Sequence, residues 1–351
     1  MNTDLDNNIS IIIPVYNAGS FVSKAVESAL IQPEVKEVIL IEDGSRDNSL
    51  DICTQLAANY EKVRLFKHPG NANKGAGLSR NLGIEGATGD YIAFLDADDY
   101  FLPDRFMAER ELFKNKPNID GVYGALGFHF YSEQDKNRFP ELQTGNLTTM
   151  PGKVPPEELF LSLLWLHPKV NGYFSVDALT VKRNIFLGKT PLFNDLKLHE
   201  DTVFLLQLVS NCMIEPGILD RPVGIRGVHG HNRITKNPEN SQSRLLMWKY
   251  LYDWSAKASK NKYLQKCFEA YVVSEKIKHV KRIPALKLFI THSFSNRYFL
   301  TMGVCFNPSC RIALGNFFAG GILFLKVRIQ ARFFKNNSFI RNYRSYLIQK
   351  H

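Results

Sequence analysis

The first 130 residues alternate short apolar, often β-branched runs with amphipathic segments, and this alternation limits the possible folds more than any other feature of the chain. The run at 9–15, ISIIIPV, is apolar except for Ser10, as is typical of a strand buried on both faces. We predict further strands at 38–41, 63–66 and 91–95, and helices at 21–31, 50–57 and 79–86. This order predicts an α/β fold, a Rossmann-like and mostly parallel sheet with helices on both faces.

The composition is that of a globular protein able to bury a core without disulfide or metal staples. The chain has 351 residues, of which 44% are hydrophobic and 22% charged, and this excludes a disordered, collagen-like or disulfide-rich chain. Its five cysteines are scattered without a CxxC pair, so neither a zinc site nor a disulfide framework is expected.

The net charge of +10 comes from one end of the chain. Residues 276–351 hold seven Lys, seven Arg and no acidic residue, whereas residues 1–275 carry a net charge of −4. A uniformly basic nucleic-acid-binding protein is therefore not indicated, and no nucleic-acid partner is expected. Cations interleaved with aromatic residues, as at 333–335, suit an anionic membrane surface, with a polybasic RNA-binding tail as the rival interpretation.

We expect two regions, 1–235 and 236–351, the second mainly helical and basic. The apolar stretch 312–325 has fourteen residues with three glycines, fewer than the roughly 20 needed to span a bilayer. Residues 1–10 are polar and show no secretory signal pattern. A cytoplasmic protein, peripheral at the inner face of the cell membrane, is the expectation.

An acidic cluster, Asp96, Asp98 and Asp99, directly follows the predicted strand at 91–95. Buried carboxylates need a cation, hydrogen-bond donors or water. Oxygen ligands at this spacing suit Mg²⁺ or Mn²⁺, particularly when a diphosphate completes the coordination. A solvated acidic turn is the alternative for this motif taken alone.

Polar motifs also follow the first two predicted strands, at 13–17 and 41–47. In a parallel sheet these strand ends meet at one edge, where ligands bind. Asp43 is placed there to accept hydrogen bonds from a base or ribose, although Asp-Gly-Ser is also a common turn.

A glycine-containing segment at 73–83 precedes or opens the next predicted helix. Gly77 allows close approach to an anion, and Arg80 adds a cationic fork. The segment lacks the Gly-Lys-Ser/Thr of a phosphate-binding loop, and no GxGxxG follows the first strand, which argues against a dinucleotide-binding domain.

These four motifs, in this order and spacing, resemble those of the family 2 glycosyltransferases, inverting nucleotide-sugar transferases with the GT-A fold. The resemblance covers residues 9 to about 235 and makes that region the expected catalytic domain. It implies a donor site, most often for a UDP-sugar, with Asp98 as ligand of Mn²⁺ or Mg²⁺. The residues it places around the nucleotide and donor sugar are Pro14, Tyr16, Asp43, Gly77, Arg80, Asp96 and Ala97.

The resemblance also implies a catalytic base about a hundred residues downstream, the Asp of a Glu-Asp pair that opens an apolar helix. Asp201, within LHEDTVFLL at 198–206, matches this description. From the sequence alone, Glu200 and Asp201 are equally well explained as acids at a helix start.

A third element, 226–233, is expected to reach the metal or diphosphate in similar enzymes. His229 is the preferred candidate, with His231 and Arg233 after it. A zinc site or a polar covering loop are the alternatives. Two aromatic stretches, 123–131 and 173–174, either line a substrate groove or belong to the core.

The implied reaction is single displacement with inversion by a hexosyl- or N-acetylhexosaminyltransferase. A glycan or lipid-linked acceptor and a role in cell-surface polysaccharide synthesis are expected. Two alternatives remain, a sugar nucleotidyltransferase and a non-catalytic nucleotide-binding protein at the membrane. A sugar nucleotidyltransferase carries a Gly-rich Arg/Lys loop near its first strand, and this sequence has no such loop there. The second is expected to tolerate loss of Asp201.

Overall fold

A computed structural model describes residues 5, 7–139, 145–187, 192–230, 232, 241–259, 262–278, 288 and 291. By its internal contacts the chain divides into two compact units, 1–236 and 237–351.

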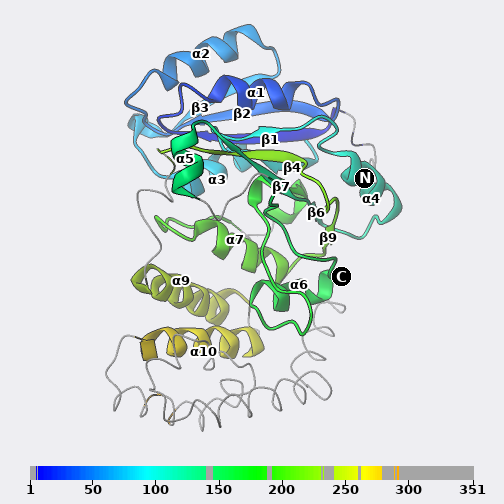
Figure 1. The fold of residues 1–351 in the computed structure, drawn as a ribbon, viewed down its shortest axis with the longest axis vertical. Helices are drawn as coiled ribbons and strands as arrows, with labels where there is room; N and C mark the ends of the chain where they lie inside the picture. The colour runs from blue at the N-terminus through cyan, green and yellow to red at the C-terminus, as the bar shows by residue number, and fades with distance from the viewer. Residues whose placement is uncertain are drawn as a thin grey trace. The chain divides into compact units, whose positions relative to one another are not determined.

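The first unit is built on a seven-stranded sheet with the order β3-β2-β1-β4-β8-β6-β9 (Figure 1). Four strands run parallel on one side of it: β1 (Ile9–Val15), β2 (Val35–Glu42), β3 (Val63–Lys67) and β4 (Tyr91–Phe94). The other three are β6 (Gly121–Tyr123), β8 (Leu179–Lys182) and β9 (Ile214–Pro216). The sheet is mixed, because β8 is antiparallel to both β4 and β6. The other pairs of neighbouring strands are parallel, which confirms the predicted mostly parallel α/β fold.

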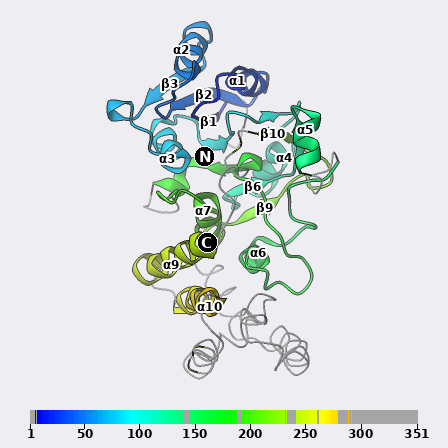
Figure 2. The ribbon, with the colours of Figure 1, turned by 60° about the vertical axis from the view of Figure 1, so that its left-hand side comes forward.

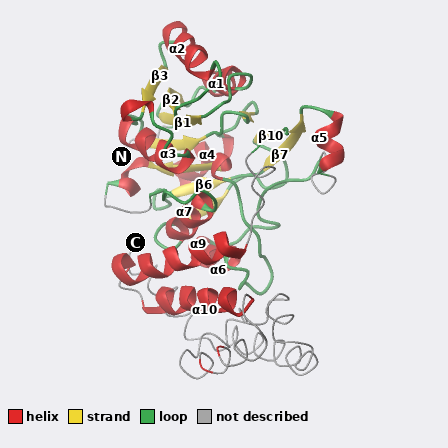
Figure 3. Ribbon diagram, turned by 90° about the vertical axis from the view of Figure 1, so that its left-hand side faces the viewer, coloured by secondary structure: helices red, strands yellow, loops and turns green. Residues whose placement is uncertain are grey.

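Helices cover both faces of the parallel strands, as predicted. Helices α1 (Val22–Leu30) and α2 (Ser49–Asn59) pack on one face, and α3 (Ala76–Gly86) packs against β1 and β2 from the other (Figures 1 and 3). On the α3 side, Gly83 permits close packing, because a Cβ atom there would lie 2.4 Å from the Ile12 side chain. Every residue of β1 is buried, which explains why its sequence is apolar except for Ser10.

A smaller three-stranded sheet has the order β5-β10-β7, formed by β5 (Tyr100–Phe101), β7 (Leu126–Phe130) and β10 (Gly224–Val228). Figure 2 shows β10 and α5 (Glu133–Arg138) on the side of the unit away from β3. Helix α4 (Met107–Asn115) packs on β6, and α6 (Pro156–Leu163) packs against α7 (Glu200–Val209). The described residues of this unit also form three short 3₁₀ turns: η1 (Pro69–Asn71), η2 (Val176–Ala178) and η3 (Arg183–Phe186).

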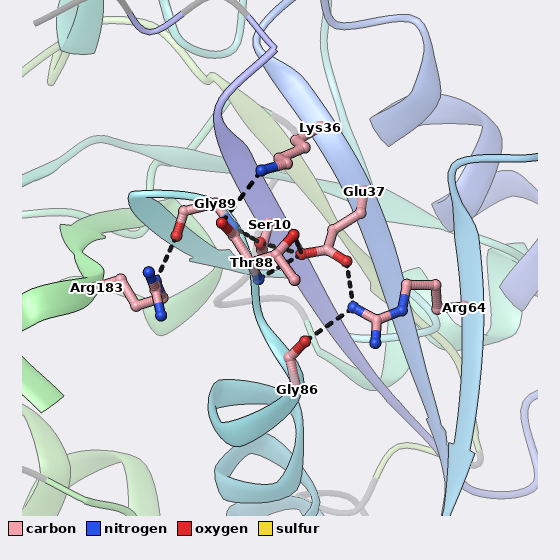
Figure 4. A network of polar contacts seen from close by, with 8 residues as sticks. All are labelled: Ser10, Lys36, Glu37, Arg64, Gly86, Thr88, Gly89 and Arg183. Carbon is pink, nitrogen blue, oxygen red and sulfur yellow. Dashed lines mark hydrogen bonds and ion pairs between the residues drawn. The ribbon is translucent and has the colours of Figure 1, made fainter. Parts of the chain in front are cut away.

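A buried carboxylate fastens the amino ends of the parallel strands (Figure 4). Glu37 of β2 accepts hydrogen bonds from Ser10 of β1 at 2.6 Å, from Arg64 of β3 at 2.6 Å and from the Thr88 amide at 2.7 Å. Burial disfavours its charged form, but these hydrogen bonds outweigh that cost and hold the Glu37 pKa below its ordinary value. One ionised side chain thus joins three strands to the loop between α3 and β4.

In the second unit, α9 (Ser241–Trp254) and α10 (Lys262–Lys278) pack together, joined in part by a π-helical segment at Ser255–Ser259. Trp248 stacks on Tyr271 with ring centroids 4.2 Å apart. Among the described residues, no helix combines the length and hydrophobicity that a membrane crossing requires. The stretch 312–325 and nearly all of the basic region 276–351 lie outside the described residues.

Candidate active site

Arg80 contacts two other predicted site residues, one of them 121 positions away in the sequence. From α3, its guanidinium donates to Asp96 Oδ1 at 2.6 Å and to Asp201 Oδ1 at 2.8 Å. Arg80 is almost fully buried, whereas the two carboxylates are more than a third exposed. Burial opposes the charge of Arg80, but Asp201 and Asp96 outweigh it and raise the Arg80 pKa. Arg80 therefore stays cationic and fixes both carboxylates at the edge of the site.

Asp201 lies in the first turn of α7, as the sequence predicts. Its neighbour Glu200 is buried, so the two acids of the pair have different environments. Asp201 faces solvent with one oxygen on Arg80, and among the described residues its Oδ2 accepts no hydrogen bond. The helix N-terminus favours the negative charge of this carboxylate.

Asp98 and His229, the two predicted metal ligands, are in direct contact. His229 Nε2 lies 3.0 Å from Asp98 Oδ2, which also accepts from the Asn232 amide at 2.8 Å. The imidazole stacks on Phe21, with centroids 4.5 Å apart and planes within 15°. This stacking and the Asn232 contact set the orientation of the pair. His231 and Arg233, the other candidates in this segment, lie outside the described residues.

Two carboxylates near Asp96 are buried: Asp99, the last member of the acidic cluster, and Asp177. Asp177 accepts the Asp96 amide at 3.2 Å, and Asp99 accepts the Gly227 amide at 2.9 Å. Burial, reinforced by the charge of Asp96, raises the Asp177 pKa to about 7. Burial and the charges of Asp177 and Asp98 raise the Asp99 pKa well above its usual range. The neighbouring, partly buried Arg226, which donates to Ser175 at 3.0 Å, partly offsets these effects.

Asp43 follows β2 and is buried, with both carboxylate oxygens engaged by the chain. It accepts the Lys74 amide at 2.7 Å and the Gly75 amide at 2.8 Å, and its main-chain oxygen accepts from Asn73 at 2.9 Å. Asp43 therefore holds the loop before α3 against the strand end. Contact with a nucleotide remains a prediction for this residue.

The other predicted donor-site residues lie at strand ends or on α3. Pro14 is buried near the end of β1, Tyr16 follows it half exposed, and Ala97 is buried between Asp96 and Asp98. At Gly77 a Cβ atom would lie 2.6 Å from the Asn194 carbonyl oxygen. This glycine thus permits α3 to pack against the segment before α7, a role that the sequence analysis did not foresee.

The chemistry of the donor set fits a divalent cation. Asp98 with His229 offers carboxylate oxygen and imidazole nitrogen, which together fit Mn²⁺ better than Mg²⁺. Asp96, Asp99 and Asp177 form a second group whose carboxylate oxygens lie within 4.8 Å of one another. Arg80 already binds Asp96, and Arg226 lies beside the other two, so cations of the protein itself balance much of this second group.

The aromatic stretches 123–131 and 173–174 each contain both buried and exposed rings. Tyr123 and Phe174 are buried and stack with centroids 4.2 Å apart, so these two belong to the core. Tyr173 is 63% exposed, and Tyr131 is also exposed and packs near His229.

Sequence reasoning missed Asp177, Asn232 and Phe21. Asp177 is the Asp of a Ser-x-Asp turn in which Ser175 caps η2, an ordinary local pattern without a functional motif. Asn232 lies within the segment already singled out, but its contact with Asp98 spans 134 positions of sequence. Such contacts depend on how β10 pairs with its neighbours.

Comparison with known proteins finds glycosyltransferases among the similar sequences. The sequence model of glycosyl transferase family 2 matches residues 10–161. An uncharacterized glycosyltransferase, YibD, of Escherichia coli is 48% identical over 219 residues, covering 59% of this chain and 58% of that protein. Chondroitin synthase of Pasteurella multocida is 38% identical over 154 residues, covering 40% of this chain and 15% of that protein. The matches thus span less than two thirds of the length of these relatives.

Among solved structures, Staphylococcus aureus TarS 1–349 in complex with UDP-GlcNAc has a similar fold, with a TM-score of 0.56 at 15% identity, covering 97% of this chain and 91% of that one. TarS 1–349 without a named ligand gives a TM-score of 0.50 at 13% identity, covering 93% and 91%. The fold is similar to that of the GT-A enzymes, and residues 10–161 of the chain match the family 2 glycosyltransferases.

Proposed function

We propose that this protein is an inverting glycosyltransferase that moves a sugar from a UDP-sugar to a hydroxyl of a glycan or lipid-linked acceptor. The observation that carries the proposal is the arrangement around Arg80. It brings Asp96, at the end of β4, and Asp201, at the start of α7, onto one guanidinium. A carboxylate for the donor side and one for the acceptor side thus meet at the carboxyl edge of the sheet.

The donor nucleotide is assigned to the strand ends. Tyr16 offers an exposed ring after β1, and Asp43 holds the loop at 73–75 beside the end of β2. TarS, which shares the fold, was solved with UDP-GlcNAc and with UDP, and this similarity favours a uridine nucleotide.

Asp98 and His229 would hold the divalent cation, Mn²⁺ or Mg²⁺. When bound, the cation would neutralise the negative charge that develops on the departing diphosphate. The Phe21 ring and the Asn232 amide orient this pair, so the ligands are arranged before the donor arrives.

Asp201 would act as the general base. Its solvent-facing Oδ2 would accept the proton of the acceptor hydroxyl, while Arg80 holds the carboxylate by Oδ1. Among the described site carboxylates, Asp96 is held by Arg80 and Asp98 by His229, and Asp99 and Asp177 are buried. With no other carboxylate assigned as nucleophile, the proposed reaction is single displacement with inversion at C1.

Nucleotide release from a sugar nucleotide tests this proposal. The full chain is incubated with UDP-, GDP- and dTDP-sugars in Mn²⁺, Mg²⁺ or EDTA. Release from one donor that requires the metal supports the proposal, whereas absence of both release and nucleotide binding refutes it.

The wider role follows from the acceptor class. Transfer to lipid-linked or surface glycans fits docking of the basic region 276–351 at the inner face of the cell membrane, and we include this peripheral location in the proposal. A non-catalytic nucleotide-binding protein is the alternative, and the exposed position of Asp201 on Arg80 disfavours it, because such a protein has no use for a poised carboxylate.

A further inference from the structure

Two exposed aromatic residues lie on the segment that links α6 to the site. Trp165 is 66% exposed and Tyr173 is 63% exposed. Their neighbours point inward, since Leu164, Leu166 and Phe174 are all buried. Large aromatic side chains stabilise a fold mainly by being buried, so these two exposed rings contribute little to stability through packing.

Trp165 also occupies an unfavourable backbone conformation. Helix α6 ends in a Schellman motif, in which the Leu166 amide donates to the Leu161 oxygen at 2.8 Å and the Trp165 amide to the Ser162 oxygen at 3.1 Å. Trp165 is the left-handed residue of this motif, with φ of 58°. Glycine is the usual residue there, and a bulky side chain is strained. An exposed tryptophan at a glycine position points to a function for the ring.

A compact polar turn supports the two rings. The His167 ring accepts the Val170 amide at Nδ1 at 2.9 Å, and its Nε2 lies 2.7 Å from Glu158 of α6. Burial, and then the charge of Lys169, lower the His167 pKa, which agrees with a neutral ring that donates from Nε2. The Asn171 side chain closes the turn by accepting from and donating to the main chain of His167. The rings are thus presented on a rigid support.

The backbone positions of Trp165 and Tyr173 are close to each other and to the candidate site. The amides of Trp165 and Gly172 both donate to the Ser162 oxygen, which brings the two ends of the turn side by side. Tyr173 and Asp177 are four positions apart, a span of at most about 14 Å. Asp177 accepts the amide of Asp96, and Ser175 between them accepts from Arg226.

We propose that Trp165 and Tyr173 form an acceptor subsite that binds a sugar ring of a glycan by stacking. Aromatic faces match the apolar C–H faces of pyranose rings, and the polar edges of both partners stay in water. Lys169 is the charged residue of the turn at 167–171, so an anionic or a neutral glycan is accommodated. This inference rests on the proposed transferase function and names its acceptor as a carbohydrate chain.

Binding of defined tetrasaccharides to the full chain tests the subsite without catalysis. Chitotetraose, maltotetraose and a hyaluronan tetrasaccharide are the probes, followed by tryptophan emission and by calorimetry. The chain has three tryptophans, so a comparison of wild type with Trp165→Phe isolates the Trp165 signal. We expect one tetrasaccharide to change this signal, and Trp165→Ala and Tyr173→Ala each to weaken its binding by roughly tenfold. Tyr60→Ala, which removes an exposed aromatic ring after α2, is the control and should bind as wild type does.

Trp165→Gly separates a binding role from a structural one. Glycine relieves the left-handed backbone, so the thermal midpoint should stay unchanged or rise while tetrasaccharide binding falls. A large loss of stability, or unchanged binding, would overturn the inference. So would an emission change with anionic phospholipid vesicles in place of every tetrasaccharide, or no change with any probe.

Failure of the proposed transferase function and failure of the acceptor subsite give different results in these experiments. A chain that binds a tetrasaccharide at Trp165 but shows no metal-dependent UDP binding retains the subsite and loses the transferase assignment. A chain that binds UDP with Mn²⁺ but no tetrasaccharide retains the transferase and loses the subsite.

Discussion

At the scale of single residues, the surroundings of Asp201 suggest its role as the general base. Asp201 shares Arg80 with Asp96, yet keeps one oxygen directed to solvent. Asp201→Asn preserves the size of the side chain and one oxygen for Arg80, but removes the proton acceptor. We expect sugar transfer to fall at least about 100-fold, the usual scale for a general base, with UDP affinity little changed.

A coupled assay for transfer, with calorimetry for UDP, checks this prediction, and Asp51→Asn in the exposed part of α2 is the matched control. More than a few per cent of wild-type activity in the Asp201 variant would remove the base assignment.

At the scale of elements, the Glu37 network joins β1, β2 and β3 at the end of the sheet opposite the site. Glu37→Gln removes the charge that receives Ser10, Arg64 and Thr88, and should lower the free energy of unfolding at pH 7 by about 1–3 kcal/mol. The folded pKa of Glu37 lies below its ordinary value of 4.5. Its contribution is therefore present above that value and is lost as the pH falls through the folded pKa, so the difference from wild type should shrink in acid.

Urea unfolding of both proteins between pH 3 and 8 measures this difference, with the exposed Glu61→Gln as control. Equal stabilities at pH 7, or a gap that widens in acid, would contradict the role given to Glu37.

The sequence predicts the parallel strands and their helices well because each carries its own periodic or continuous apolar pattern. Strand β1 is predicted at its observed bounds, and α7 begins at the predicted Glu-Asp pair. The antiparallel insertion of β8 between β4 and β6 is not predictable in this way, since its four residues carry no distinctive pattern. The contact of Asp177 with the Asp96 amide depends on that insertion, which is why Asp177 was missed.

For the whole molecule, the separation of charge is the main feature, with a net charge of +14 on residues 276–351 against −4 on the remainder. We predict that the full chain pellets with vesicles containing anionic phospholipid and that salt weakens this binding. Replacing Arg328, Arg332, Lys335, Arg341 and Arg344 by serine should reduce vesicle binding at least roughly tenfold. Equal pelleting of the two proteins, or a preference for single-stranded RNA over vesicles, would exclude the membrane role.

The most direct test of the transferase account is nucleotide release by wild type and by Asp98→Ala under identical conditions. Asp98 contacts His229 and Asn232 without belonging to the hydrophobic core, so the variant is expected to fold. The account predicts metal-dependent release from one sugar nucleotide by wild type and loss of that metal dependence, with weaker donor binding, in the variant. Equal release by both proteins, with or without EDTA, would contradict the proposed site.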